Sequence, residues 1–418
     1  MSGEAQILSP VQEAADLQRL LQAVIEGRAV GTPPADWPRT LALAQAHHLD
    51  AFLFDAVAAR PAELRPEAAL MEEWTRRQRS QVVGTYRIRA QRAELLAALK
   101  AAGVAAIPLK GAWLAETVYP DLAQRPMSDM DLLIRPEQLE AAQAAMTRLG
   151  YAVKDEDQPG GWSKGRLYLH PQWRCAVELQ WTLWHPSHEL TPELDPACLW
   201  NAAENGLLSG VEVPLLPPAV HLVYLTYHHQ AHLWRLPARA LLDIVLLGRR
   251  FATKLSVAEL EAEARAWDLA FRAPFVWRVA HDVCGVEPPA ELAEWTRPLE
   301  TSVAERRAAL EIALYTQWQT ESMTRLLSEF RQASGWRRAL VGARAVFAPP
   351  AMIRQSHPVA TRWGGLAGGY AARAADLVRR RLRDAFPGAQ RRAGVARAAD
   401  AMSARLRLGR WLAEQERE

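Results

Sequence analysis

Cysteine, lysine and long apolar runs are scarce in this sequence of 418 residues. The three cysteines, Cys175, Cys198 and Cys284, lie far apart and form no CxxC pair, which argues against a disulfide framework and against a thiolate zinc site. The first residues lack the basic start and the apolar run of a secretory signal, and no run of about 18 apolar residues predicts a membrane-spanning helix. We therefore expect a cytoplasmic protein with reduced thiols.

Only five of the 50 basic residues are lysines, and the basic charge is distributed unevenly. Residues 331–418 contain 18 Arg, no Lys and 6 acidic residues, which gives this segment a net charge of +12. The other 32 basic and 41 acidic residues give residues 1–330 a net charge of −9. The basic character of the chain therefore belongs to its C-terminal part.

Composition and length predict a globular protein of more than one domain. Half of the residues are apolar and 23% are charged, as in ordinary globular proteins. A chain of 418 residues also exceeds what one hydrophobic core usually organises. From the hydrophobic periodicity we expect a helical N-terminal region over residues 1–100, a core with strands over 101–215, a helical domain over 216–345, and a linker with an Arg-rich amphipathic helical tail over 346–418.

The predicted fold class is α+β, with a small mixed sheet embedded in mostly helical N- and C-terminal regions. Helices and strands alternate only within residues 101–215, where short apolar runs are bounded by Gly and Pro. Short helices are expected at Ala112–Val118 and Glu137–Leu149. The predicted strands are Val104–Leu109, Asp129–Ile134, Tyr151–Val153, Leu167–Leu169 and Ala176–Trp181.

Two aspartates separated by one residue stand in the predicted strand Asp129–Ile134. Because side chains alternate across a strand, Asp129 and Asp131 project from the same face. Their carboxylates repel each other unless a cation offsets the charge, and a hard divalent ion such as Mg²⁺ prefers oxygen ligands. Glu178, in an otherwise apolar strand, would supply the third carboxylate of a two-metal phosphoryl-transfer site. A solvated edge strand is the alternative for the two aspartates.

Lys110 and Gly111 form a further candidate site, at the turn between a predicted strand and a predicted helix. A glycine there lets the backbone approach a phosphate, and the first amides of a helix point towards an anion. Lys110 adds a positive charge and is one of only five lysines. A Lys-Gly pair is common by chance, so it is the position shortly before Asp129 that gives this pair its weight.

The run LKGAWLAETVYPDLAQRPMSDMDLLIRPEQLEAAQAAMTRLGY resembles the uncharacterised nucleotidyltransferase family of the polymerase-β superfamily. The family pattern is a KG turn followed by R-x-x-x-D-hydrophobic-D, then a helix and a Gly-Tyr pair. Glu178 falls where the family has a later acid, and the resemblance extends over residues 85–250. The residues that match the pattern in order are Lys110, Gly111, Arg125, Ser128, Asp129 and Asp131.

This resemblance implies an NTP substrate, Mg²⁺ or Mn²⁺ as the metal, release of pyrophosphate, and a helical domain behind a minimal sheet of the polymerase-β nucleotidyltransferase type. It assigns metal binding and catalysis to three acids, and nucleotide binding to four residues before them. The acids are Asp129, Asp131 and Glu178, and the nucleotide-binding residues are Lys110, Gly111, Arg125 and Ser128.

Two positions depart from the family pattern. Ala112 stands where the superfamily usually has Ser or Gly, which removes a hydroxyl group near the phosphate. The later acidic segment reads Glu178-Leu179-Gln180-Trp181 where the family has Asp-Leu-His-Trp, so the acid is longer and a His is missing. Arg125 has two interpretations of equal weight: it pairs with a triphosphate oxygen, or it neutralises Asp121 or Asp129 in a structural ion pair.

Four histidines between residues 221 and 232 invite a zinc interpretation, since His228 and His232 lie four residues apart on one helical face. No HExxH motif and no nearby Cys accompanies them. The segment continues into Trp234 and Asp243, so we favour hydrogen-bonded core packing or an acceptor pocket. The 16 tryptophans are spread along the chain and are not interleaved with basic runs, so nucleic-acid binding is not expected.

In the tail, over residues 366–412, apolar residues recur at helical spacing among arginines. A helix of this kind lies on an anionic membrane surface or docks on an acidic protein partner, and we give these two equal weight, ahead of a plain solvated helix and of RNA binding. Peripheral attachment to a membrane is therefore an alternative to a purely cytoplasmic location.

Together these features predict a metal-dependent nucleotidyltransferase. It would transfer a nucleoside monophosphate from an NTP to an unidentified acceptor, namely a small molecule, peptide, glycan or protein side chain, by two-metal catalysis. The alternative is a non-catalytic nucleotide-binding or scaffold protein that docks on a membrane surface or an acidic partner through its basic tail. No motif names the base of the NTP, the acceptor or the oligomeric state.

Overall fold

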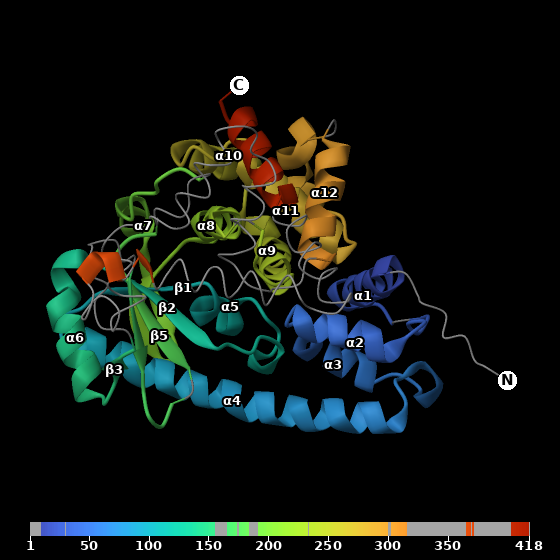
Figure 1. The fold of residues 1–418 in the computed structure, drawn as a ribbon, viewed down its shortest axis with the longest axis horizontal. Coiled ribbons are helices and arrows are strands. Elements are labelled where there is room, and N and C mark those ends of the chain that lie inside the picture. The colour runs from blue at the N-terminus through green and yellow to red at the C-terminus, as the bar shows by residue number, and fades with distance from the viewer. Residues whose placement is uncertain are drawn as a thin grey trace. The chain divides into compact units, whose positions relative to one another are not determined.

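Figure 1 shows a computed structural model of the chain. The chain divides into two compact units. The first comprises residues 1–156, 163–314 and 412–418, and the second comprises residues 157–162 and 315–411. Elements α1 to α11 belong to the first unit, and so does every site discussed below. The structure describes residues 10–29, 31–154, 165–173, 175–183, 191–232, 234–299, 302–315, 365–368, 370–371 and 403–417.

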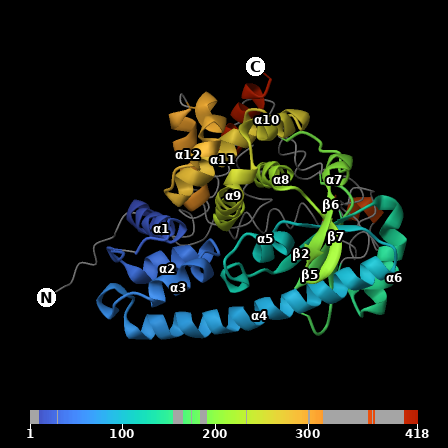
Figure 2. The ribbon, with the colours of Figure 1, turned by 180° about the vertical axis from the view of Figure 1, so that it is seen from behind.

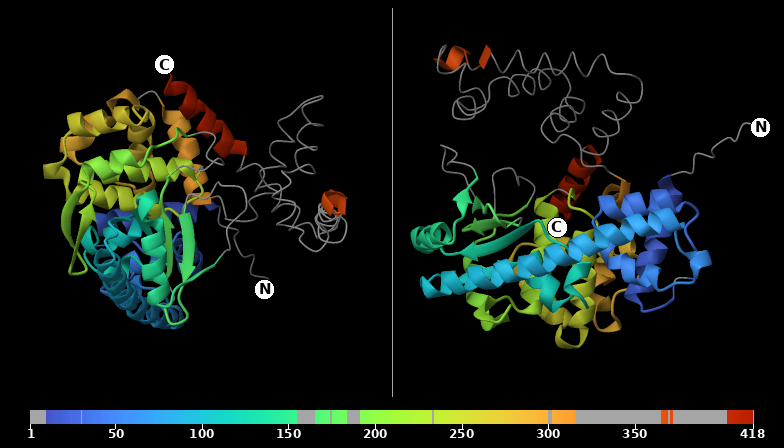
Figure 3. Two further views of the ribbon diagram at one scale, coloured as in Figure 1. Left: turned by 90° about the vertical axis from the view of Figure 1, so that its left-hand side faces the viewer. Right: turned by 90° about the horizontal axis from the view of Figure 1, so that it is seen from below.

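The N-terminal part is helical, as the sequence predicts. The carboxylate of Asp36 caps α2 by accepting a hydrogen bond from the backbone N–H of Arg39, at 3.0 Å. Helix α4 has 34 residues and is therefore about 50 Å long; it runs past both the other N-terminal helices and the sheet (Figure 3, right). The elements are α1 (Pro10–Ile25), α2 (Trp37–Ala46), α3 (Asp50–Ala58), η1 (Ala62–Leu64) and α4 (Ala68–Ala101).

A five-stranded mixed sheet follows, with the strand order β1-β2-β5-β4-β3. Strands β2 and β5 pair in parallel, and the other neighbouring pairs are antiparallel. The predicted α+β class with a small mixed sheet is confirmed. The elements are β1 (Ala106–Leu109), α5 (Gly111–Thr117), η2 (Leu122–Gln124), β2 (Asp129–Ile134), η3 (Pro136–Gln138), α6 (Leu139–Arg148), β3 (Ala152–Val153), β4 (Gly165–Leu169) and β5 (Ala176–Gln180).

The two central strands bury one face completely. Met130 and Leu132 on β2, and Val177 and Leu179 on β5, are all fully buried. Because side chains alternate along a strand, the residues between them project from the opposite face. Those intervening positions carry the acids of the candidate site. The apolar face packs in the core and stabilises the two strands, and the acids project from the other face.

A second, two-stranded sheet was not predicted. Strands β6 (Glu204–Leu208) and β7 (Val211–Leu215) form an antiparallel hairpin after α7 (Ala197–Ala202) (Figure 2). Its two-residue turn, Ser209 and Gly210, has φ angles of 51° and 80°, which is the positive-φ pair of a tight hairpin turn. The carboxylate of Glu116 on α5 accepts hydrogen bonds from the N–H and the hydroxyl of Ser209, at 3.0 and 2.8 Å, and fixes the turn to the core.

Helices make up the remainder of the first unit. Helices α9 and α11 approach closely because Gly248 has no side chain: a Cβ there would lie 2.0 Å from the ring of the buried Trp277. The elements are α8 (Pro218–Ala231), α9 (Arg239–Arg250), η4 (Ala252–Lys254), α10 (Val257–Ala266), α11 (Arg272–Cys284), η5 (Ala290–Leu299) and α12 (Val303–Tyr315).

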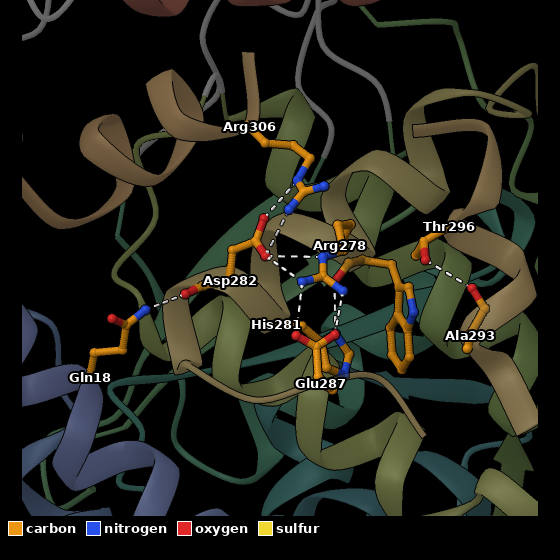
Figure 4. A network of polar contacts seen from close by, with 9 residues as sticks. Gln18, Arg278, His281, Asp282, Glu287, Ala293, Thr296 and Arg306 are labelled. Atoms are coloured by element: carbon orange, nitrogen blue, oxygen red, sulfur yellow. Dashed lines mark hydrogen bonds and ion pairs between the residues drawn. The ribbon is translucent and has the colours of Figure 1, made fainter. Parts of the chain in front are cut away.

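Asp282 on α11 joins three helices through a polar network (Figure 4). Arg306 on α12 donates to both of its carboxylate oxygens, at 2.8 and 3.2 Å, and Arg278 donates to one of them at 3.0 Å. Gln18 on α1 donates to the backbone carbonyl of Asp282. This network lies apart from the acids of the central strands and serves the packing of α1, α11 and α12.

A residue near the C-terminal end of the chain caps the N-terminus of α11. The carboxylate of Glu416 accepts hydrogen bonds from the backbone N–H groups of Phe271 and Arg272, at 3.2 and 3.0 Å, where α11 begins. Most of the predicted tail, residues 366–412, lies outside the described residues. None of the described helices has the length and the apolar character that a membrane span requires.

Candidate functional site

The three predicted acids lie on the two central strands of the mixed sheet. In the parallel pairing of β2 and β5, Asp131 stands opposite Glu178 and Asp129 stands opposite Ala176. Residues paired in this way project from the same face of a sheet. Strand pairing thus places Glu178 on the face that the spacing predicts for Asp129 and Asp131.

Lys110 reaches this face from the turn after β1. Its Nζ donates to Oδ1 of Asp131 at 2.8 Å, and Nε2 of Gln180 donates to the same oxygen at 2.7 Å. The backbone of Lys110 has φ 50° and ψ −129°, a conformation that costs a residue with a side chain about 1–3 kcal/mol. Strained backbone of this kind clusters at functional sites, and here it directs Lys110 towards an acid.

Charge dominates the surroundings of Lys110. Burial alone would lower the pKa of its ammonium group, but attraction to the carboxylates of Asp131 and Glu178 outweighs burial, so the pKa lies above its ordinary value. Burial also raises the pKa of Tyr224 on α8, where Lys110 acts in the opposite direction. Helix α8 therefore contributes a neutral, buried phenol to the acidic face.

The acids differ in exposure. Asp131 is 6% exposed, whereas Asp129 at the start of β2 is exposed and accepts a hydrogen bond of 3.2 Å from the hydroxyl of Ser128. Cys175 lies beside them at the start of β5. Burial, followed by the carboxylates of Asp129 and Asp131, raises its pKa to about 12, so the thiol stays protonated at neutral pH.

Arg125 has a partner that the sequence did not indicate. Its Nε and Nη2 donate to the two carboxylate oxygens of Asp243 on α9, at 2.8 and 2.7 Å, and the hydroxyl of Tyr119 donates to Asp243 at 2.7 Å. The interpretation of Arg125 as an ion-pair partner of Asp121 or Asp129 is therefore wrong about the partner. Asp121 instead caps η2, where its carboxylate accepts from the N–H of Ala123 at 2.7 Å.

The requirement for glycine at position 111 comes from this ion pair. A Cβ at Gly111 would lie 2.2 Å from Nη1 of Arg125 and 2.9 Å from Sδ of Met127. The backbone of Gly111 has an ordinary helical conformation at the start of α5, so the lack of a side chain, and not backbone freedom, is what the position needs. The close approach predicted for a phosphate is made in this structure by a guanidinium group.

The two departures from the family pattern occupy buried positions. Ala112 is 1% exposed, and its backbone carbonyl accepts a hydrogen bond of 2.6 Å from Arg92 on α4. Gln180 is 2% exposed and donates to Asp131. Both side chains are therefore part of the packed support of the site: Ala112 fills the core below the turn, and Gln180 orients an acid.

Two histidines of α8, His221 and His229, belong to the core. His221 is fully buried and stacks on Trp113, with ring centroids 4.5 Å apart. Burial lowers the pKa of His221 to about 3, so the ring is neutral. The rings of His228 and His232 contact each other at a centroid distance of 4.5 Å. In the described part of the chain no group of three His, Cys, Asp or Glu side chains is arranged to hold a metal ion, which applies to these histidines and to the three acids.

Comparisons with known proteins bear on this arrangement. A family model described as an uncharacterised nucleotidyltransferase matches residues 33–285, more than half of the chain. A solved structure of the antibiotic-resistance factor ANT(2'')-Ia is similar at 16% sequence identity and a TM-score of 0.31, over 45% of this chain and 91% of that chain. No curated protein matches. The family match, which includes the turn and all three acids, carries the assignment.

Proposed function

Because this chain belongs to the family of uncharacterised nucleotidyltransferases, we propose that it transfers a nucleoside monophosphate from an NTP to an acceptor. A nucleophilic oxygen or nitrogen of the acceptor attacks the α-phosphorus. The bond from that phosphorus to the bridging oxygen of the β-phosphate breaks, and pyrophosphate leaves with the electron pair.

One observation carries the proposal: three carboxylates share one face of two paired strands, and a strained lysine approaches them from the turn after β1. Catalysis of phosphoryl transfer consists mostly of positioning and charge stabilisation, so it needs groups of this kind held by rigid strands. Asp129, Asp131 and Glu178 are on such strands.

The donor set suits a divalent cation in type, because three carboxylates supply the hard oxygen ligands that Mg²⁺ and Mn²⁺ prefer. We propose that Asp129 and Asp131 hold the metal that binds the triphosphate, and that Glu178 completes a second position with them. Two cations bound there would neutralise the charge that develops on the phosphates and lower the pKa of an acceptor hydroxyl.

Lys110 and Ser128 bind and orient the substrate in this proposal, while Arg125 and Gln180 hold the surrounding groups in place. Lys110 lies beside Asp131 and offers a positive charge to the β- and γ-phosphates, and Ser128 offers a hydroxyl next to Asp129. Arg125 uses two nitrogens on Asp243, and its Nη1 lies against Gly111 at the turn. Gln180 holds the carboxylate of Asp131 in place.

Calorimetric titration of the full chain with each of the four NTPs, in the presence of Mg²⁺, tests the proposal without knowledge of the acceptor. We expect at least one NTP to bind the native protein, and we expect Asp129→Asn/Asp131→Asn to abolish that binding. Glu72→Gln, on the exposed surface of α4, is the matched control and keeps the native affinity. Absence of NTP binding to the native protein would contradict the proposal.

A non-catalytic nucleotide-binding protein is the second candidate. It is favoured by the hydrogen bonds that Lys110 and Gln180 make to one oxygen of Asp131, since both donors compete with a metal for that oxygen. Binding of an NTP without pyrophosphate release, in any acceptor mixture, would support this candidate.

Docking of the tail, residues 366–412, on a membrane or an acidic protein stays a prediction. Flotation with anionic liposomes, on the chain with and without residues 349–418, tests the membrane form.

A further inference from the structure

A pocket of about 620 Å³ lies beside the acidic face, and none of the seven residues assigned above to metal or nucleotide lines it. Its volume is within the range of small-molecule sites. One wall is a face of α4, where the lining residues recur every four positions: Arg79, Val83, Arg87 and Gln91. The opposite wall comes from Met127 and from Gln172 and Trp173.

The pocket lies next to the proposed reaction site, as positions along the chain and packing contacts indicate. Met127 is two residues before Asp129, and its Sδ lies against Gly111 at the turn. Trp173 is three residues before Ala176, which pairs with Asp129. Nε2 of Gln91 donates to the carbonyl of Cys175 at 2.9 Å, so the α4 wall is bound to the start of β5. A molecule in this pocket therefore lies at the end of the sheet where β2 begins with Asp129.

The opposite wall is held in place. Nδ1 of His170 accepts hydrogen bonds from the backbone N–H groups of Gln172 and Trp173, at 3.1 and 3.2 Å. Nε2 of His170 is 2.9 Å from the carbonyl of Leu149, which fixes the ring. These contacts of His170 fix the turn that carries Trp173 in place as a wall of the pocket.

The charge of the pocket is positive and unmatched. Arg79 and Arg87 have no ion-pair or hydrogen-bond partner among the described residues, and none of the described lining residues is acidic. Other arginines of α4 are paired: Arg76 with Glu72 and Arg92 with Glu116. Guanidinium groups bind carboxylates and phosphates through paired hydrogen bonds. The two unpaired arginines stand about 12 Å apart along the helix.

A glycine keeps the pocket open. Gly84 lies in the interior of α4 and lines the pocket, and a Cβ added there would meet no atom within 4 Å. Neither its backbone angles nor close packing requires glycine, although glycine inside a helix costs about 0.5–1 kcal/mol relative to alanine. Val83, next to it, leaves 53% of its surface exposed. The α4 wall thus offers an apolar, unobstructed floor between two arginines.

We propose that this pocket binds the acceptor, and that the acceptor combines an apolar body with an anionic phosphate or carboxylate group. The inference rests on the proposed function, because only a nucleotidyl transfer needs an acceptor at this position. The apolar body lies over Val83 and Gly84, and the anionic group pairs with Arg79 or Arg87. The nucleophilic end of the acceptor then points towards Asp129.

Ligand-observed ¹⁹F NMR on the full chain tests the pocket with three probes: 4-fluorobenzoate, 4-fluorophenyl phosphate and the neutral 4-fluorobenzyl alcohol. We expect at least one anionic probe to bind about tenfold or more tightly than the alcohol, and the stronger anion distinguishes a carboxylate from a phosphate acceptor. Arg79→Gln/Arg87→Gln should weaken the anionic probes about tenfold, whereas Arg76→Gln, an arginine of α4 that does not line the pocket, should leave their affinity unchanged. Equal binding of all three probes, or unchanged affinity in the double variant, would overturn the proposal.

A steric variant keeps the test independent of charge. Gly84→Leu places a side chain in the open space of the pocket and improves helix propensity. The variant should therefore fold, and its denaturant midpoint of unfolding should equal or exceed that of the native protein. Binding of the anionic probes should nevertheless be lost. Retained probe binding in folded Gly84→Leu would contradict the assignment of the pocket.

Titration of the same variants with Mg²⁺ and NTP separates this proposal from the function on which it rests. Retention of NTP binding by Arg79→Gln/Arg87→Gln supports an acceptor pocket. Loss of NTP binding in that variant would show a nucleotide pocket and overturn the acceptor assignment. If the native protein binds the anionic probes but no NTP, the nucleotidyltransferase proposal and the acceptor role fail together, and the anion site alone is retained.

Discussion

Two clusters of charged side chains lie near the start of β2 and differ in the groups that they contain. Arg125, Asp243 and Tyr119 form a buried set in which one guanidinium faces one carboxylate, with Arg125 6% and Asp243 3% exposed. In the other cluster, three carboxylates accompany Lys110, and Asp129 is exposed.

The difference separates architecture from chemistry. A buried ion pair with matched charges and good geometry holds elements together, and here it connects the segment before β2 to α9. Carboxylates grouped on one face repel one another, and such groups are typical of sites that bind a charged ligand. The first cluster therefore positions the second, and substitutions in the two clusters should affect different quantities.

The largest expected effect is on stability, in the matched cluster. Asp243→Asn leaves the buried guanidinium of Arg125 without its countercharge, so we expect the free energy of unfolding to fall by about 3–5 kcal/mol. Urea denaturation followed by tryptophan fluorescence measures this loss. A decrease below about 1 kcal/mol, the range of a surface ion pair, would show that the pair is not a structural anchor.

Gly111 offers a steric test of the same cluster. Gly111→Ala brings a Cβ to 2.2 Å from Nη1 of Arg125, so the ion pair must shift, and we expect a loss of about 1–3 kcal/mol in unfolding free energy. Gly84→Ala, in the open part of α4, is the matched control and should gain about 0.5–1 kcal/mol. Equal stabilities for the two variants would indicate that Arg125 does not lie over Gly111.

His221 makes the stability of the matched cluster depend on pH. Its ordinary pKa of 6.5 falls to about 3 because burial outweighs the opposing attraction to Asp243, and Arg125 lowers the pKa further. Between these values the unfolded chain binds a proton that the folded chain does not, so stability falls as the pH decreases from about 6.5 towards about 3, by up to about 1.4 kcal/mol per pH unit. Urea unfolding of the native protein and of His221→Leu at pH 7 and pH 5 measures the difference. His281, whose pKa is lowered to about 4, contributes equally to both proteins; identical pH dependence would contradict the assignment.

The smallest expected effect on stability comes from the acidic cluster, which consists of Lys110 and the three carboxylates. Asp129 is exposed and accepts only the hydroxyl of Ser128 among the contacts identified, so Asp129→Asn should change the free energy of unfolding by less than about 0.5 kcal/mol. Thermal and urea unfolding without added nucleotide check this expectation. A loss comparable with that of Asp243→Asn would remove the distinction between the two clusters.

The sequence predicted the elements that depend on local pattern. Strand β2 occupies the predicted residues 129–134, and the acids lie on one face because alternation along a strand is a local property. The family match confirms the resemblance seen in the KG turn and the two aspartates. The hairpin β6–β7 was missed, although Ser209-Gly210 between two short apolar runs was a usable turn signal.

Long-range partners could not be predicted from one sequence. Arg125 and Asp243 are 118 residues apart, and only the packing of α9 against the core brings them together. The role of Gly111 follows from that pairing, since no local pattern indicates which side chain will cross a glycine. The pocket wall on α4 could not be predicted for the same reason. Its two arginines differ from their paired neighbours only in what surrounds them in the fold.

The most direct test of the central claim compares ligand-induced stabilisation of the native protein and Asp129→Asn. With Mg²⁺ and the preferred NTP at about 100 times its Kd, the native protein should gain about 2.7 kcal/mol in unfolding free energy. Asp129→Asn, equally stable without ligand, should gain nothing. An equal gain in both proteins would contradict the claim that the carboxylates of this face form the metal–nucleotide site.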